Sequence, residues 1–134
     1  MLTSRKAEVS VEFLVFVGII LVFFVFFFGI IGSKTREINQ VTLFDNAQSI
    51  ADEIADEINI AARFEGYYRE FQLPENLING YNYSVVFHKE LRLVEVKWNG
   101  NSAMSTLVTE NITGNVSRGH NSLKNENGVI VIEG

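Results

Sequence analysis

The feature that most constrains this chain is an uncharged run of 19 residues, Phe13–Ile31, that is apolar apart from two glycines. At about 1.5 Å of rise per residue, a helix of this length reaches about 28 Å, close to the roughly 30 Å hydrocarbon thickness of a bilayer. A soluble core helix is rarely apolar on every face for so long, and a secretory signal usually has a shorter apolar stretch, of about 7–15 residues. The run therefore predicts one membrane-spanning helix.

Basic residues flank the run on both sides, so the positive-inside rule does not orient the helix. Arg5 and Lys6 precede it, and Lys34 and Arg36 follow it closely. Orientation has to be inferred from other features.

An amphipathic pattern follows the apolar run without an intervening proline. Apolar and small residues recur every three or four positions, which is the period of one helix face. The acidic residues of this stretch fall largely off that stripe, and one continuous helix is predicted from about residue 10 to about residue 64. The stripe consists of Ile38, Val41, Phe44, Ala47, Ala51, Ile54, Ile58 and Ala61.

From Gly66 onward, β-branched and aromatic residues alternate with polar ones between turn signals such as Asn99-Gly100. An Asn-rich segment, Glu110–Asn127, is predicted to be a loop. A sheet this small buries too little by itself, so it needs the amphipathic helix as its second layer. The predicted fold class is α+β, with a long amino-terminal helix packed on a small antiparallel sheet. Its strands are predicted at Tyr83–Phe87, Leu91–Trp98, Ala103–Thr109 and Gly128–Glu133.

Composition argues against several classes of function. The formal net charge of −5 offers no basic face for nucleic acid, and the absence of cysteine removes thiolate chemistry. His88 and His120 stand apart, without the spacing of a metal site or a catalytic triad. We therefore expect no enzyme activity, no metal, no cofactor and no nucleic-acid partner. Tyr67, Tyr68, Tyr81, Tyr83 and Trp98 are more typical of sheet packing than of a carbohydrate surface.

The junction ahead of the apolar run carries a carboxylate, Glu12, at the edge of the hydrocarbon. An acid costs about 2.5–3.5 kcal/mol at mid-membrane and less near the interface, so such residues are candidates for function. The alternative is that Ser10 caps the helix and that Glu12 lies in its first turn, where the helix dipole favours an acid by about 0.3–1 kcal/mol. The physical argument leaves both interpretations open.

The order Lys6-Ala7-Glu8-x-Ser10-x-Glu12-Phe13-Leu14 resembles the processing site of archaeal type IV pilins that carry class III signal peptides. Two positions depart from that family's pattern, since Glu8 replaces Gln and Phe16 replaces Leu. The likeness extends to Ala51–Ala62, to Phe71-x-Leu73-Pro74 and to Gly80-Tyr-Asn-Tyr83.

The resemblance implies that a prepilin peptidase cuts between Ala7 and Glu8 and that Glu12 acts in assembly. It divides the chain into a leader (1–7), a transmembrane and filament-core helix (8–32), an amphipathic helix (33–65) and an extracellular β-sheet domain (66–134). The implied partners are other copies of the chain, the peptidase, the pilus assembly machinery and, before assembly, the membrane. The implied location is the cell surface, in an extracellular adhesion filament.

Two other functions stay open at this point. The chain could be a permanently membrane-anchored binding or scaffold module that retains its first residues. It could also be an exported soluble protein cut near Gly32-Ser33. Sequons for N-glycosylation at Asn82, Asn111 and Asn115 suit an exported domain, and Asn82 is expected in a strand.

Overall fold

The computed structural model describes residues 2–134, apart from the side chains of residues 2–6, 33 and 35. It divides into two compact units, Met1–Gln40 and Val41–Gly134. One helix, α1 (Leu2–Ala61), runs through both units and confirms the predicted continuous helix. It ends three residues before the predicted boundary, and a bend at Gly66, with φ +76°, leads the chain into the first strand.

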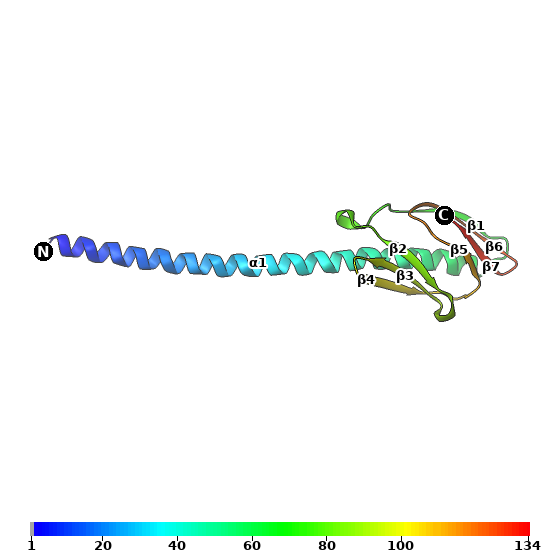
Figure 1. The fold of residues 1–134 in the computed structure, drawn as a ribbon, viewed down its shortest axis with the longest axis horizontal. Coiled ribbons are helices and arrows are strands. Elements are labelled where there is room, and N and C mark those ends of the chain that lie inside the picture. The colour runs from blue at the N-terminus through cyan, green and yellow to red at the C-terminus, as the bar shows by residue number, and fades with distance from the viewer. Residues whose placement is uncertain (1) are drawn as a thin grey trace. The chain divides into compact units, whose positions relative to one another are not determined.

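The second unit, which we call the head, adds seven strands to the last turns of α1 (Figure 1). Four strands form one sheet in the order β1-β6-β7-β5, and three form a second sheet in the order β2-β3-β4. The strands are β1 (Tyr68–Leu73), β2 (Ser84–His88), β3 (Leu93–Trp98), β4 (Asn101–Thr106), β5 (Ile112–Gly114), β6 (Gly119–Glu126) and β7 (Val129–Glu133).

The predicted α+β class is confirmed, and so are four strands within a few residues, as β2, β3, β4 and β7. The strands form two sheets rather than one, and β5 pairs parallel to β7, so the larger sheet is mixed. Two Asn-Gly pairs make the tight hairpin turns, Asn99-Gly100 between β3 and β4 and Asn127-Gly128 between β6 and β7. All four of these residues have positive φ, as such turns require.

The prediction of a loop over Glu110–Asn127 is wrong, because this segment contains β5 and the eight-residue β6. The inward positions of β6 are Gly119, Asn121, Leu123 and Asn125, of which only Leu123 is a large apolar residue. The sequence of β6 therefore does not show the apolar–polar alternation that usually identifies a strand. The buried amides are satisfied: Asn121 Nδ2 donates to the carbonyls of Ser117 and Gly119, and Asn121 Oδ1 accepts from the Ser117 N–H.

Asn125 closes the end of α1. Its Nδ2 donates to the carbonyl of Ala61, the last helical residue, at 2.8 Å, and its Oδ1 accepts from the Gly128 N–H at 2.9 Å. A helix end leaves carbonyls without partners inside the helix. One buried side chain of β6 thus satisfies a helix carbonyl and the hairpin turn together.

The core of the head lies between α1 and the two sheets. The predicted stripe is confirmed from Ala47 onward, since Ala47, Ala51, Ile54, Ile58 and Ala61 are all buried. Its first three members, Ile38, Val41 and Phe44, are exposed: the first two precede the core, which begins at Leu43, and Phe44 lies at its margin with its ring 6.3 Å from that of Trp98. Leu43, Ile50 and Ala55 are also buried, since two sheets cover a wider arc of the helix than a single stripe predicts.

Side chains of α1 also protect the outer edge of β4. The amide of Gln48 donates to the carbonyl of Met104 at 2.8 Å. The amide of Asn59 donates to the Thr106 carbonyl and accepts from the Val108 N–H. An unpaired strand edge is a template for association with other chains, and these amides occupy part of it.

Candidate functional site

The predicted processing and assembly residues lie together on the first turns of α1. Ala7, Glu8, Val11 and Glu12 line one shallow depression on the helix surface, and all are exposed. Glu8 and Glu12 are one turn apart, so their carboxylates share a helix face. Ser10 is also helical and exposed. The side chain of Lys6 lies outside the described part of the chain, as does Met1.

The idea that Ser10 caps the helix is wrong for the intact chain. The helix begins at Leu2, so Ser10 and Glu12 lie in its interior. The favourable dipole at a helix amino terminus fades within the first turn and does not reach Glu12. The helix dipole therefore does not explain why a carboxylate occupies position 12.

No positive charge stands near these carboxylates along the following helix. The next basic residue after Lys6 is Lys34, which lies about 33 Å of helix rise beyond Glu12. Lys34 itself pairs with Glu37, at 3.8 Å between Nζ and Oε2. Within the described residues, Glu8 and Glu12 thus form an acidic pair at the start of an uncharged segment.

The apolar run itself is exposed along its whole length in this chain, with large side chains from 36% to 71% accessible. Ile20, Phe23, Phe24, Phe27, Phe28 and Ile31 line an apolar groove on one helix face, and the rings of Phe24 and Phe28 stack at 6.3 Å. Of the described helices, α1 alone is long and apolar enough to cross a membrane.

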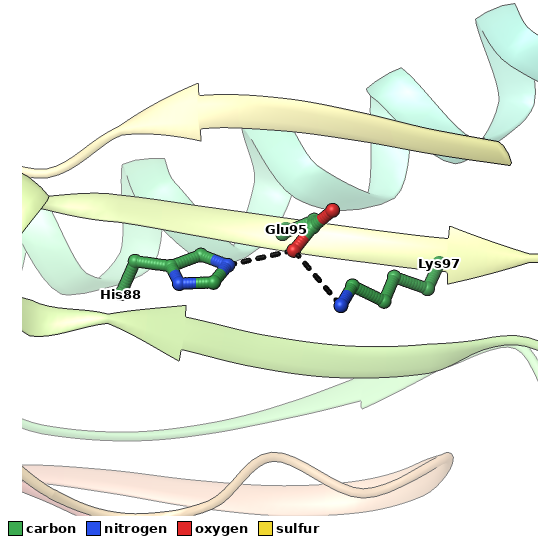
Figure 2. Close-up of polar contacts among 3 residues, drawn as sticks. All are labelled: His88, Glu95 and Lys97. Atoms are coloured by element: carbon green, nitrogen blue, oxygen red, sulfur yellow. Dashed lines mark hydrogen bonds and ion pairs between the residues drawn. The ribbon is translucent and has the colours of Figure 1, made fainter.

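The head contains a polar cluster that the sequence analysis missed (Figure 2). Glu95 on β3 is 6% exposed. Its Oε2 accepts a hydrogen bond from His88 Nε2 at 2.6 Å and forms an ion pair with Lys97 Nζ at 3.4 Å. The hydrogen bond from His88 lowers the pKa of Glu95, Ser102 and Lys97 add to this, and burial opposes it. The sequence alone could not indicate that His88 contacts Glu95. The contact arises only when β2 pairs with β3 in this register.

A second buried acid, Glu57, lies on α1 and pairs with Arg69 of β1 at 3.2 Å. Burial raises the pKa of Glu57, and Glu53 and Asp56 act in the same direction, while Arg69 opposes them. The other carboxylate oxygen, Oε2, is buried without a hydrogen-bond partner among the described residues. Within those residues, no group of three His, Asp or Glu side chains could hold a metal ion.

The asparagines of the three sequons, Asn82, Asn111 and Asn115, are all exposed. Asn82 lies outside β2, which begins at Ser84, so its predicted place in a strand is wrong. Its Oδ1 accepts a hydrogen bond from Arg118 at 2.8 Å. Asn111 and Asn115 flank β5. Whether any of the three is glycosylated stays a prediction.

The aromatic residues of the head do not form one surface. Tyr83 and Trp98 are buried, and burial raises the pKa of Tyr83 to about 12. Tyr68 and Tyr81 are exposed. The Tyr83 hydroxyl donates to the carbonyl of Pro74 at 2.5 Å, which is a structural role.

Comparison of the chain with models of known protein families, with curated proteins and with solved structures finds no match.

Proposed function

We propose that this chain is a structural subunit of an archaeal type IV pilus-like surface filament, a pilin or minor pilin that a prepilin peptidase processes. The observation that carries the proposal is the exposed apolar run of α1, headed by Glu12 and attached to a head with its own core. In the membrane, lipid covers this run. In a filament, neighbouring helices cover it, and the large exposed side chains supply the packing surface.

The proposal gives Glu12 a task. A cut after Ala7 leaves a new ammonium on Glu8, and this charge leaves the headgroups when the subunit enters the filament core. Glu12 lies one turn further along, about 6 Å in rise, and an opposite charge offsets part of the desolvation of the ammonium. The pair forms within one subunit or between neighbours that are staggered along the core.

The first test is the amino terminus of the mature chain. We expect the full chain, produced with a prepilin peptidase, to lose Met1–Ala7 and to begin at Glu8 by intact mass and peptide mapping. A product that still begins at Met1 would favour the anchored binding or scaffold module. A product that begins near Ser33 would favour an exported soluble protein.

The second test separates assembly from insertion. In Glu12→Ala and Glu12→Gln, the ammonium loses the Glu12 carboxylate and keeps only the carboxylate of Glu8 as a counter-charge, so assembly should be impaired rather than abolished. We expect less protein in the sheared-filament fraction with membrane insertion unchanged, and cleavage after Ala7 is measured separately. Glu37→Ala is the matched control, because Glu37 is an exposed acid on the same helix. Normal filament yield from both Glu12 variants would remove the assembly role.

The third test concerns orientation, which the flanking charges do not decide. We expect protease added to intact cells without their surface layer to digest the head in the unassembled pool. Digestion only after lysis would place the head inside the cell and contradict the proposal.

A further inference from the structure

We infer that the heads of neighbouring copies contact each other through opposite charges: the basic β2–β3 turn of one copy docks into an acidic groove on α1 of the next. The inference rests on the proposed function and concerns a contact that the heads add to the packing of the apolar run. It starts from two surfaces of the head that carry opposite charge.

The acidic groove lies on the face of α1 that the sheets leave uncovered. Five carboxylates line it within about four helix turns, and four of them are exposed. In the described structure, the one basic side chain that forms an ion pair with any of them is Arg69. The five acids are Asp45, Asp52, Glu53, Asp56 and Glu57.

The fifth acid, Glu57, shows that the negative charge of the groove is not fully compensated within the chain. Glu57 lines the groove and is only 9% exposed. Its Oε1 pairs with Arg69, whereas its Oε2 has no hydrogen-bond partner among the described residues. A buried carboxylate is costly unless positive charge or donors surround it. A cation in the groove therefore gains from Glu57 as well as from the exposed acids.

The β2–β3 turn supplies such cations. It consists of the short 3₁₀ helix η2 (Lys89–Leu91) and of Arg92, and it projects from the head (Figure 1). Lys89 and Arg92 are exposed, and neither forms an ion pair within the described part of the chain. With Glu90 as its one acid, the turn keeps a net positive charge.

Apolar side chains of the two surfaces also match. Leu91, in the turn, is 69% exposed. Val41 lies four residues before Asp45 and Ile60 four residues after Asp56, so both share the helix face of the groove. They are 56% and 40% exposed. The groove thus has an apolar residue at each end, against which Leu91 can leave water while the basic side chains reach the acids.

The occupant that fits the groove is a second copy of this chain. Charge complementarity is present between two different surfaces of the same head. A contact between different surfaces of identical subunits leaves one of each surface free, so it continues from copy to copy into an open filament. A contact between identical surfaces would close into a dimer. The proposed function requires the first kind.

The test reverses the two charges separately and together in the full chain. Lys89→Glu with Arg92→Glu makes the turn acidic, and Glu53→Lys with Asp56→Lys makes the groove basic. We expect each of these two chains to leave about fivefold less protein in the sheared-filament fraction, because an exposed ion pair changes an equilibrium constant by up to about fivefold. The chain with all four substitutions should regain the wild-type yield, since reversed turns then meet reversed grooves.

Glu110→Lys with Glu133→Lys is the matched control. It changes the net charge as the groove variant does, at two exposed acids of the head that do not line the groove. We expect the wild-type yield of filaments from this control. A loss as large as that of the groove variant would assign the effect to net charge and overturn the inference.

A second measurement uses the absence of cysteine from the chain. Leu91→Cys places a thiol on the turn, and Ser49→Cys places one in the middle of the groove, where Ser49 is exposed. A short bismaleimide should join filaments that carry both thiols into a ladder of covalent multimers. Filaments with either thiol alone should stay monomeric.

Three further results would overturn the inference. They are failure of the four-substitution chain to recover, covalent dimers from a single-thiol variant, and filaments with both thiols that give no ladder. Peptide mapping separates these results from a failure of the proposed function, because filaments whose subunits begin at Glu8 keep that function without the contact. If no filaments form, the proposed function fails, and crosslinking in the membrane pool decides the contact: a ladder supports it and monomers refute it.

Discussion

Isoleucine side chains meet opposite surroundings in the two compact units of the chain. Ile54 and Ile58 in the head are fully buried, whereas Ile19 and Ile30 in the first unit are 51% and 59% exposed. The head therefore draws its stability from its own core. In the first unit, the described residues from Ala7 to Gly32 are all exposed, so whatever covers this apolar stretch has to come from outside. The two units should thus respond differently to the same chemical change.

The largest expected difference comes from truncating a buried isoleucine. Ile54→Ala leaves a cavity between α1 and the sheets and should lower the free energy of unfolding of the head by about 2–5 kcal/mol. The measurement is denaturant unfolding of the full chain in detergent, followed by Trp98 fluorescence. Ile20→Ala removes the same atoms from the apolar run and should leave the midpoint unchanged. If both variants lowered the free energy of unfolding equally, the two units would not be stabilised separately.

Glycine substitutions should separate the units next. Gly114 has φ +90°, and an added Cβ would lie 1.9 Å from the carbonyl oxygen of Ile132. Overpacking costs about 1–3 kcal/mol and a left-handed residue about 1–2 kcal/mol, so Gly114→Ala should destabilise the head clearly. Around Gly29 an added Cβ meets nothing within 4 Å, so Gly29→Ala should leave head unfolding unaffected. Gly100 has φ +79°, and an added Cβ there meets nothing within 4 Å. Gly100→Ala therefore measures the cost of the left-handed backbone alone, without overpacking.

Removing the amide that closes α1 should have a somewhat smaller effect. Asn125→Ala leaves the Ala61 carbonyl and the Gly128 N–H without partners, at a cost of about 1–3 kcal/mol. Gln72→Ala, on an exposed position of β1, is the control and should be nearly neutral. Amide hydrogen exchange should show faster exchange in the last turn of α1, while the apolar run keeps its rate in detergent. A variant as stable as the control would show that water replaces the amide.

The smallest expected effect is a pH dependence confined to the head. The pKa of Glu95 in the folded state is lowered from the ordinary value of a glutamate, first by the hydrogen bond from His88. Its stabilising contribution is therefore complete above about pH 4.5 and is lost as the pH falls through the folded pKa. Glu95→Gln should unfold with a shallower acid dependence than wild type. An unchanged acid profile would show that the contacts with His88 and Lys97 contribute little.

The pattern of apolar residues predicted α1 and four of the seven strands correctly, because α1 is first apolar on every face and then amphipathic, and these strands carry β-branched and aromatic residues between turn signals. The run Phe13–Ile31 and the buried face from Ala47 onward follow directly from spacing. Strand β6 was missed because two of its inward positions are asparagines, Asn121 and Asn125, whose amides are satisfied by backbone groups that only the folded chain brings near. Periodicity reports side-chain polarity and not hydrogen-bond partners.

The candidate site was also predictable only in part. A helix places Glu8 and Glu12 on one face whatever follows, so sequence alone indicates their proximity. The helix start at Leu2, which removes Ser10 as a cap, was not predictable, because the apolar pattern begins only near Val9. The contact of Glu95 with His88 depends on the pairing of β2 with β3, and the contact of Glu57 with Arg69 depends on where β1 crosses α1.

The strand order of the larger sheet has a consequence for how the chain acquires its fold during synthesis. β1 is the first strand made, yet its neighbour is β6, and residue 68 pairs with residue 124. The amide that closes α1 also belongs to β6. Until β6 has emerged, β1 has no partner strand, and the apolar face of α1 has little of that sheet to pack against. Contacts so distant in sequence form slowly, since the loop between them has to close first. The synthesis of β6 and β7 therefore controls when the head becomes resistant to proteases and to association with other unfinished chains.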